Sequence, residues 1–78
     1  MTNQEKYTAA FADALNVAAG ETAALQYGQS AAWDSVGHMR LIANLEDAFD
    51  IMLDMDDIID FSSFEKGKEI LRKYDVEL

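Results

Sequence analysis

The residue types of a hydrolytic triad occur within the stretch DSVGH, as Asp34, Ser35 and His38. A triad requires a base that contacts the nucleophile and a carboxylate that orients the base. Residues one and three positions apart on one helical turn cannot make these serial contacts, and no Gly-x-Ser-x-Gly elbow surrounds the serine. We therefore assign no catalytic residue and expect a protein that is not an enzyme. For His38 we expect a hydrogen bond to the preceding loop.

A second cluster of chemically capable side chains, Asp54, Asp56 and Asp57, offers carboxylates of the kind that bind calcium. The segment lacks the glycine that a calcium loop needs at its sixth position, and Ile58 occupies the fifth, which is a ligand position. One histidine and no cysteine exclude multi-histidine and thiolate sites. We predict no metal site and a solvated acidic helix cap.

The composition restricts the classes of partner. Fifteen acidic and six basic residues among 78 give a formal charge of −9, which repels nucleic acid phosphates and anionic lipid and attracts basic protein surfaces. Tyr27 and Trp33 are therefore expected to anchor a loop to the core, not to stack on bases. The apolar runs are too short to span a membrane, and the first residues lack a signal-peptide pattern. We expect a cytoplasmic protein without a membrane span.

The hydrophobic pattern predicts an all-α protein. Proline is absent and apolar residues recur at spacings of three and four, which favours a small four-helix bundle with three long helices and one short one. Residues 1–78 should form a single domain. A capping box at Thr2 and Glu5 opens the first helix, and Gly20 is expected to end it. A long loop over residues 21–33 follows. The core stripe of the first helix is predicted to be Tyr7, Phe11, Ala14, Leu15 and Ala18.

The second helix is expected to begin at Asp34 or Ser35 and to continue to about Asp50. A short helical turn should follow at residues 54–60, capped by Asp54 or Asp56. Its apolar contacts are predicted to be Met55, Ile58 and Ile59. The core face of the second helix is predicted to be Leu41, Ile42, Leu45, Ala48, Phe49 and Met52.

A capping box at Ser62 and Glu65 is expected to open the last helix. Lys68 lies at the edge of its inner stripe and should bury its aliphatic stem while its ammonium group reaches solvent. The whole inner stripe is predicted to be Phe64, Gly67, Lys68, Leu71 and Tyr74.

A second apolar stripe lies opposite the core face of the second helix. Val36, Met39 and Ala43 share it at helical spacing beside Ser35, and the carboxylates of Glu46, Asp47 and Asp50 continue it toward the helix C-terminus. An apolar patch bordered by charges suits transient protein docking. Scattered apolar residues on a surface are also ordinary, so spacing alone leaves both interpretations open.

The stretch WDSVGHMRLIANLEDAFDI resembles the acyl carrier protein family, whose motif is Asp-Ser-Leu at the start of the second helix, then Leu-x-x-x-Leu-Glu-x-x-Phe. Asp34 and Ser35 match this motif, and Val36 stands where the family has leucine or methionine. The later motif positions also keep their spacing, and the helix order extends the resemblance in weaker form over nearly the whole chain. These later positions are Leu41, Leu45, Glu46 and Phe49.

The resemblance implies that Ser35 carries 4′-phosphopantetheine, transferred from coenzyme A by a phosphopantetheinyl transferase, and that Asp34 caps the helix and presents Ser35. The pantetheine thiol would then hold an acyl group as a thioester, so the chain needs no cysteine of its own. Other implied partners of this monomeric carrier are acyl-loading and acyl-processing enzymes with basic docking patches. The implied partner contacts are Val36, Met39, Arg40, Ala43, Glu46 and Asp47.

The turn of residues 37–40, Gly-His-Met-Arg, departs from the family pattern, because this turn is usually more acidic in fatty-acid carriers. Gly37 lies in the first helical turn, where glycine costs up to about 1 kcal/mol relative to alanine, which indicates close backbone approach or a frayed start. Arg40 replaces an expected glutamate and would repel the basic patches of standard fatty-acid synthesis partners. We therefore expect a stand-alone carrier for a fatty-acid-like or specialised lipid or secondary-metabolite pathway.

Two alternatives remain at this point. One is an acidic helical interaction module that never receives a prosthetic group, in which Ser35 is only part of a helix start. The other is an aminoacyl or peptidyl carrier domain of a modular synthetase, against which the lack of linker-like flanks argues.

Overall fold

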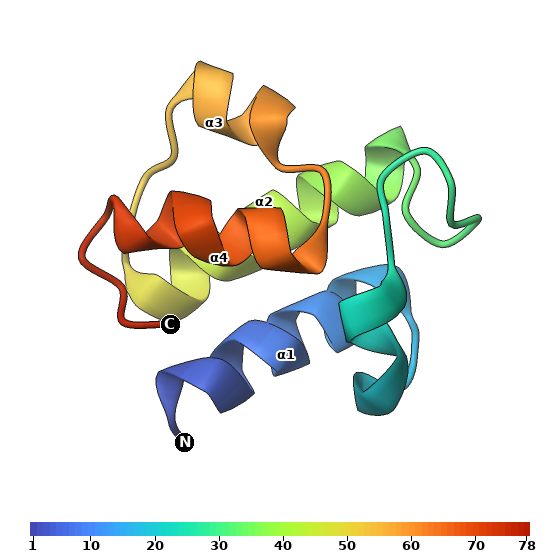
Figure 1. The fold of residues 1–78 in the computed structure, drawn as a ribbon, viewed down its shortest axis with the longest axis horizontal. Helices are drawn as coiled ribbons and strands as arrows, with labels where there is room; N and C mark the ends of the chain where they lie inside the picture. Colours follow the sequence, from blue (N-terminus) through green and yellow to red (C-terminus); the bar gives the residue numbers. More distant parts are fainter.

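The computed structural model describes residues 1–78 and is entirely helical apart from connections and one isolated bridge between Gln26 and Ser63 (Figure 1). The predicted all-α class is confirmed, with three longer helices, one short helix and a long connection between the first two. No helix has both the length and the apolar character needed to cross a membrane. The elements are α1 (Asn3–Leu15), the 3₁₀ helix η1 (Ala19–Ala24), α2 (Ser35–Phe49), α3 (Met55–Asp60) and α4 (Phe64–Arg72).

Helix α1 begins as predicted and ends earlier than predicted. The Thr2 hydroxyl accepts a hydrogen bond from the Glu5 amide at 3.1 Å, and the Glu5 carboxylate accepts one from the Thr2 amide at 2.9 Å. Asn16 ends the helix in the left-handed region, with φ 56°, which asparagine tolerates better than most residues. The predicted stop at Gly20 is therefore wrong. Gly20 lies in η1, within the long connection, and Ala18 is exposed outside the helix.

Helix α2 runs from Ser35 to Phe49 and has the predicted start. Its predicted core residues Leu41, Ile42 and Leu45 are buried. Asp50 ends the helix in the left-handed region, with φ 53°, so the chain turns away before Met52. The placement of Met52 in the core is wrong, because its side chain is 83% exposed. Ala48 is also exposed, contrary to prediction, and Phe49 is half-buried.

Helix α3 forms where a short helix was predicted, but its apolar contacts differ. Asp54 is its N-cap residue without a side-chain capping bond. Met55 and Ile59 are 71% and 69% exposed, so their predicted core contacts are wrong. Only Ile58 is half-buried and packs against the core.

Helix α4 begins one residue later than predicted. The Ser63 hydroxyl accepts a hydrogen bond from the Lys66 amide at 3.0 Å, so Ser63 is the N-cap and the capping box at Ser62 and Glu65 is wrong. Lys68 buries its stem as predicted, because its side chain is only 15% exposed. Its ammonium group lies 4.9 Å from the Phe64 ring centroid and 3.7 Å from the carboxylate of the exposed Glu65.

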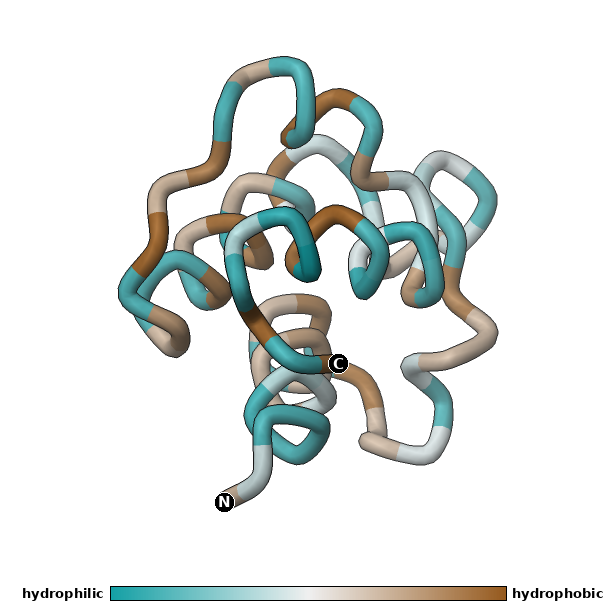
Figure 2. The backbone as a smooth tube through the Cα atoms, turned by 60° about the vertical axis from the view of Figure 1, so that its left-hand side comes forward, coloured by the Kyte–Doolittle hydropathy of each residue, from teal (hydrophilic) through white to brown (hydrophobic).

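The inner face of α4 is close to the predicted one. Its buried residues include the predicted Gly67 and Leu71, and Ile70 joins them. Tyr74 lies beyond the end of the helix and is half-buried. In Figure 2, hydrophobic and hydrophilic positions alternate along the helical stretches, as expected of amphipathic helices that share one core.

An aromatic cluster fills the centre of the bundle. The Phe11 ring centroid lies 5.3 Å from that of Trp33 and 5.0 Å from that of Phe64. Trp33 is fully buried, which confirms that this loop residue anchors the connection to the core. The Tyr7 hydroxyl donates a 2.6 Å hydrogen bond to the Phe64 carbonyl. Burial of Tyr7, with a smaller effect of Glu65, raises the pKa of its hydroxyl well above the usual value.

A polar cluster joins α3 to the end of α4. The buried Asp57 carboxylate accepts hydrogen bonds of 2.5 Å from the Lys73 ammonium group and from the Tyr74 hydroxyl. The bond from Lys73, followed by that from Tyr74, lowers the pKa of Asp57 below its usual value. No cluster of three acidic or histidine side chains converges anywhere in the chain as metal ligands would.

We expect acid to destabilise the fold through Asp57. A carboxylate whose pKa is lowered by folding stabilises the protein above its unfolded-state pKa of about 4, and this stability is lost as the pH falls through the lowered folded-state pKa. Thermal unfolding of the wild type and Asp57→Asn between neutral pH and pH 2 measures the effect. The variant should be less stable at neutral pH, and the difference should shrink below about pH 4. A difference that does not depend on pH would contradict this expectation.

Candidate functional site

Ser35 is the first residue of α2 and its side chain is exposed. The Asp34 carboxylate accepts a 2.8 Å hydrogen bond from the Gly37 amide, so Asp34 caps the helix as predicted. The Ser35 hydroxyl takes part in no hydrogen bond within the chain, since the capping role belongs to Asp34. Ser35 is therefore held on a fixed helix start with its hydroxyl free to react.

Gly37 allows this helix start to pack closely against the rest of the protein. A Cβ atom at this position would lie 2.9 Å from the Ala32 carbonyl oxygen and 2.9 Å from Cδ2 of Leu15. Both distances are shorter than ordinary van der Waals contact. The sequence left close approach and fraying as alternatives, and the structure confirms close approach. The cost of glycine in a helix is offset here by contact of the first turn of α2 with α1 and the loop.

His38 uses both ring nitrogens in the fold. The Trp33 indole Nε1–H donates to His38 Nδ1 at 3.0 Å, which confirms the predicted bond to the preceding loop. His38 Nε2 lies 2.8 Å from the Ile58 carbonyl oxygen in α3. This second contact was missed because a pairing across twenty residues leaves no local pattern in the sequence. With both nitrogens engaged, His38 is not placed to act as a base for Ser35.

The side chains that were predicted to form an exposed stripe on α2 are exposed in the structure. Val36 and Met39 are 58% and 61% exposed, and Ala43 is exposed as well. Arg40 and Asp47 are exposed on the same helix. The stripe is therefore open to solvent beside Ser35, and its role in docking stays a prediction.

Glu46 differs from the other predicted contact residues of this surface. It is half-buried, and its carboxylate accepts a 2.9 Å hydrogen bond from the Leu53 amide. Glu46 therefore holds the connection that follows α2, although it was predicted from spacing as a rim carboxylate. A partner that contacts Glu46 would have to compete for an oxygen that the fold already uses.

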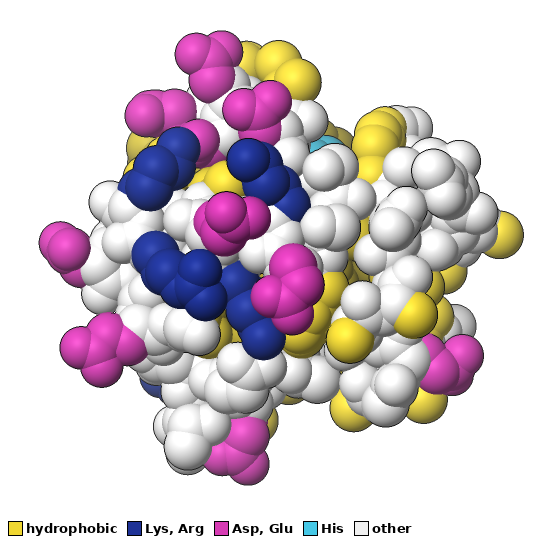
Figure 3. All heavy atoms as spheres, in the orientation of Figure 1, with side chains coloured by type: hydrophobic (Ala, Val, Ile, Leu, Met, Phe, Trp, Pro, Cys, Tyr) yellow, Lys and Arg dark blue, Asp and Glu magenta, His cyan; other side chains and the backbone are white.

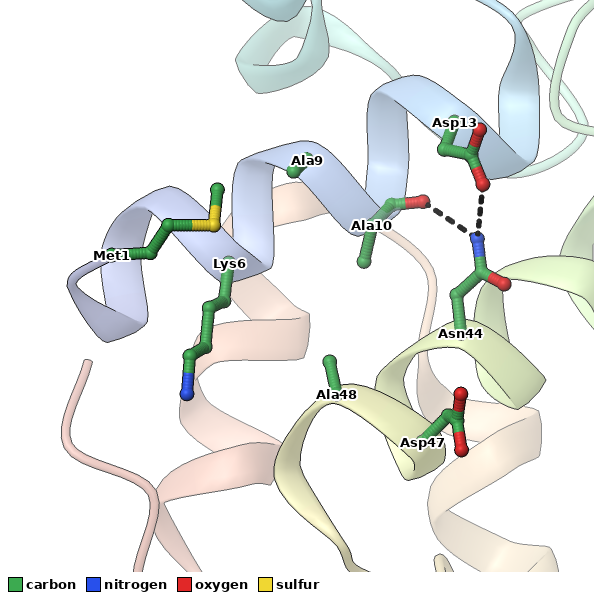
Figure 4. Close-up of a pocket in the computed structure, with 8 residues that line it drawn as sticks. All are labelled: Met1, Lys6, Ala9, Ala10, Asp13, Asn44, Asp47 and Ala48. Carbon is green, nitrogen blue, oxygen red and sulfur yellow. Dashed lines mark hydrogen bonds between the residues drawn. The ribbon is translucent and has the colours of Figure 1, made fainter.

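A groove between α1 and α2 was not predicted, because it exists only where two helices pack side by side (Figure 4). It has a volume of about 370 Å³, and the Asn44 amide closes one end by donating to the Ala10 carbonyl and to Asp13, both at 3.3 Å. A second hollow beside it shares Asn44 and Asp47. The lining residues of the groove are Met1, Lys6, Ala9, Ala10, Asp13, Asn44, Asp47 and Ala48.

Basic side chains are unevenly distributed over the surface. Figure 3 shows Lys and Arg side chains interspersed with Asp and Glu on the face that carries α4. Arg40 is the single basic residue of α2. The basic residues at and near the end of the chain are Lys66, Lys68, Arg72 and Lys73.

The residues around Ser35 fit a phosphodiester-linked group. The hydroxyl is exposed and unengaged, and an anion at the first residue of a helix faces the positive end of the helix dipole. The neighbouring Val36 side chain is exposed as well, so Ser35 lies on an open part of the surface. Comparisons with protein-family models, curated proteins and solved structures found no match. The functional conclusion therefore depends on the residues of this chain.

Proposed function

We propose that this protein is a carrier to which 4′-phosphopantetheine is attached at Ser35. The observation that carries the proposal is the exposed, unengaged Ser35 hydroxyl directly after the capping Asp34 on α2. The open apolar stripe of Val36 and Met39 beside it supports a surface that partner enzymes contact. The resemblance of the surrounding motif to acyl carrier proteins supports the same conclusion.

The attachment step fits a serine that has no base of its own. The Ser35 oxygen attacks the phosphorus that bears the pantetheine arm of coenzyme A, the pyrophosphate P–O bond breaks, and 3′,5′-adenosine bisphosphate leaves. A separate phosphopantetheinyl transferase removes the hydroxyl proton, because both His38 nitrogens are engaged elsewhere. Asp34 holds the first turn of α2 in place during the reaction.

The proposed cargo is an acyl group held as a thioester on the pantetheine thiol. The chain has no cysteine, so the arm would be the only thiol on the loaded protein. A flexible arm raises the effective concentration of the thioester at an enzyme docked on α2. We place this monomeric carrier in the cytoplasm, in a fatty-acid-like or specialised lipid or secondary-metabolite pathway.

Intact-mass measurement tests the proposal. The purified protein is incubated with coenzyme A and a phosphopantetheinyl transferase of broad specificity, and its mass is compared with that of a sample without transferase. We expect a gain of one phosphopantetheine, located at Ser35 by fragmentation. Absence of a gain would contradict the carrier function and favour an acidic interaction module, which the exposed Val36 and Met39 would also serve.

Arg40→Glu is expected to improve recognition by fatty-acid synthesis partners that have basic docking patches. Arg40 is exposed on α2, so the change replaces a repulsive charge by an attractive one. One exposed charge pair contributes up to about 1 kcal/mol, which predicts a rise of roughly two- to fivefold in kcat/KM for acyl loading.

The matched control for this prediction is Lys66→Glu, which makes the same change of charge at an exposed position of α4. It should leave kcat/KM almost unchanged if partners dock on α2. Equal effects of the two variants would show a response to net charge, and no effect of Arg40→Glu would remove the argument for a specialised pathway.

A further inference from the structure

Helix α3 is attached to the rest of the protein with little apolar burial. Met55 and Ile59 are mostly exposed, Asp56 and Asp60 are exposed, and Ile58 alone packs half-buried against the core. A helix of this length has little stability of its own in water, since helix nucleation is costly. Its position must therefore depend on the few contacts that fix it.

Two sets of hydrogen bonds fix α3. The first joins α3 to the end of α4, where Asp57 accepts from Lys73 and Tyr74 and the amide of the N-cap residue Asp54 donates to the Tyr74 hydroxyl at 2.9 Å. In the second, the Ile58 carbonyl oxygen lies 2.8 Å from His38 Nε2 in α2. Only the second contact joins α3 to the helix that carries Ser35, and it does so one turn after that serine.

The hydrogen-bond partners of His38 decide which of its ring nitrogens carries the hydrogen. The Trp33 indole nitrogen can only donate, so His38 Nδ1 must accept. Nε2 then carries the proton and donates it to the Ile58 carbonyl. The hydrogen bonds from Trp33 to His38 and from His38 to Ile58 therefore point in the same direction, and together they are called the Trp33–His38–Ile58 relay. The relay joins three segments: the loop before Ser35, the first turns of α2, and α3.

Packing around the imidazole holds this relay in place. The His38 ring lies nearly parallel to that of Trp33, at 24° with 6.1 Å between centroids. The Tyr27 ring centroid lies 4.9 Å from that of His38 and covers it from the loop side. His38 is 8% exposed, so its hydrogen bonds are largely shielded from competing water.

We propose that His38 is a positioning residue that fixes both the loop leading to Ser35 and helix α3 through these two hydrogen bonds. The relay itself is a feature of the fold, whereas its effect on attachment at Ser35 rests on the proposed function. Through Trp33 it holds the residue immediately before Asp34 and Ser35. Through Ile58 it fixes how α3 lies against α2.

Two substitutions separate the two halves of the relay. In His38→Asn, the amide oxygen can replace Nδ1 as the acceptor for Trp33, but the side chain is too short to reach the Ile58 carbonyl. In His38→Gln, the amide nitrogen can replace Nε2 as the donor to Ile58, and Trp33 loses its acceptor. Ile70→Val in the buried face of α4 is the control for general destabilisation, since it touches neither bond.

Site-resolved hydrogen exchange by NMR is the first measurement. We expect His38→Asn to accelerate exchange of the Ile58 amide roughly three- to tenfold while the Trp33 indole N–H stays protected, in line with one lost hydrogen bond. His38→Gln should give the reverse pattern. Parallel acceleration of both protons in both variants would show that the ring only fills space, and no change in either would show no coupling; both results would overturn the proposal.

Transferase kinetics with coenzyme A are the second measurement. Loss of the bond to α3 in His38→Asn should raise KM for the carrier with little change in kcat, because the start of α2, which bears the docking stripe, loses one of the contacts that hold it. Loosening the loop in His38→Gln should lower kcat, because Ser35 is less well placed. Unchanged kinetics in both variants would overturn the role at Ser35. If the wild type accepts no arm, the carrier function fails, and the exchange pattern still decides whether His38 holds the two segments.

Discussion

Ser35→Ala is expected to abolish the gain of phosphopantetheine completely when the protein is incubated with coenzyme A and transferase. The substitution removes the single oxygen that can form the phosphodiester, and no neighbouring residue can replace it in the same position. The fold should be little affected, because the Ser35 hydroxyl makes no hydrogen bond and alanine is a good helix former at the start of α2. Intact-mass measurement gives the loading, and circular dichroism checks the helix content.

Ser62→Ala is the matched control for this experiment. Ser62 is exposed, lies outside the helices and precedes α4, and only its backbone carbonyl forms a hydrogen bond, with the Tyr27 amide. The control variant should be loaded as fully as the wild type. Loading that persists in Ser35→Ala would mean that the arm is attached elsewhere, and the assignment of Ser35 would then be wrong.

Gly67→Ala is expected to cause the largest loss of stability from a single added methyl group. Gly67 is buried on the inner face of α4, and a Cβ atom there would overlap Cζ of Phe61 and the hydroxyl oxygen of Tyr7. Both neighbours are fully buried, so neither can move aside without disturbing the aromatic cluster. Overpacking of a core costs about 1–3 kcal/mol, and we expect the upper end of this range despite the better helix propensity of alanine.

Thermal and denaturant unfolding measure this effect. A domain of this size has a free energy of unfolding of about 4–12 kcal/mol. A loss near 3 kcal/mol should lower Tm by roughly 12–24 °C. Gly20→Ala is the control, since Gly20 is exposed in η1 and a Cβ atom there meets nothing within 4 Å. The control should leave Tm nearly unchanged. Equal stability of Gly67→Ala and the wild type would contradict the packing described for the core.

Local signals in the sequence predicted the helices and some of their ends. The capping box at Thr2 and Glu5 opens α1, and Asp34 caps α2, as their residue types and spacing indicated. The ends were predicted less well. Asn16 and Asp50 stop their helices in left-handed conformations that these residues adopt less readily than glycine, so the sequence pointed to Gly20 and to a longer core face instead.

In the candidate site, too, some features could be predicted from local residue patterns and others could not. The sequence by itself determined that Asp34 caps α2 directly before Ser35 and that Val36 and Met39 share an exposed stripe, because both follow from residue types at helical spacing. The choice of Ser35 as the attachment residue came from the resemblance of its motif to acyl carrier proteins. The tertiary structure decided the Trp33–His38–Ile58 relay, the groove between α1 and α2, and the use of Glu46 to hold Leu53. These features join residues on different elements. Their geometry depends on how the helices pack, and hydrophobic periodicity records which face of a helix is buried but not which residue it meets there.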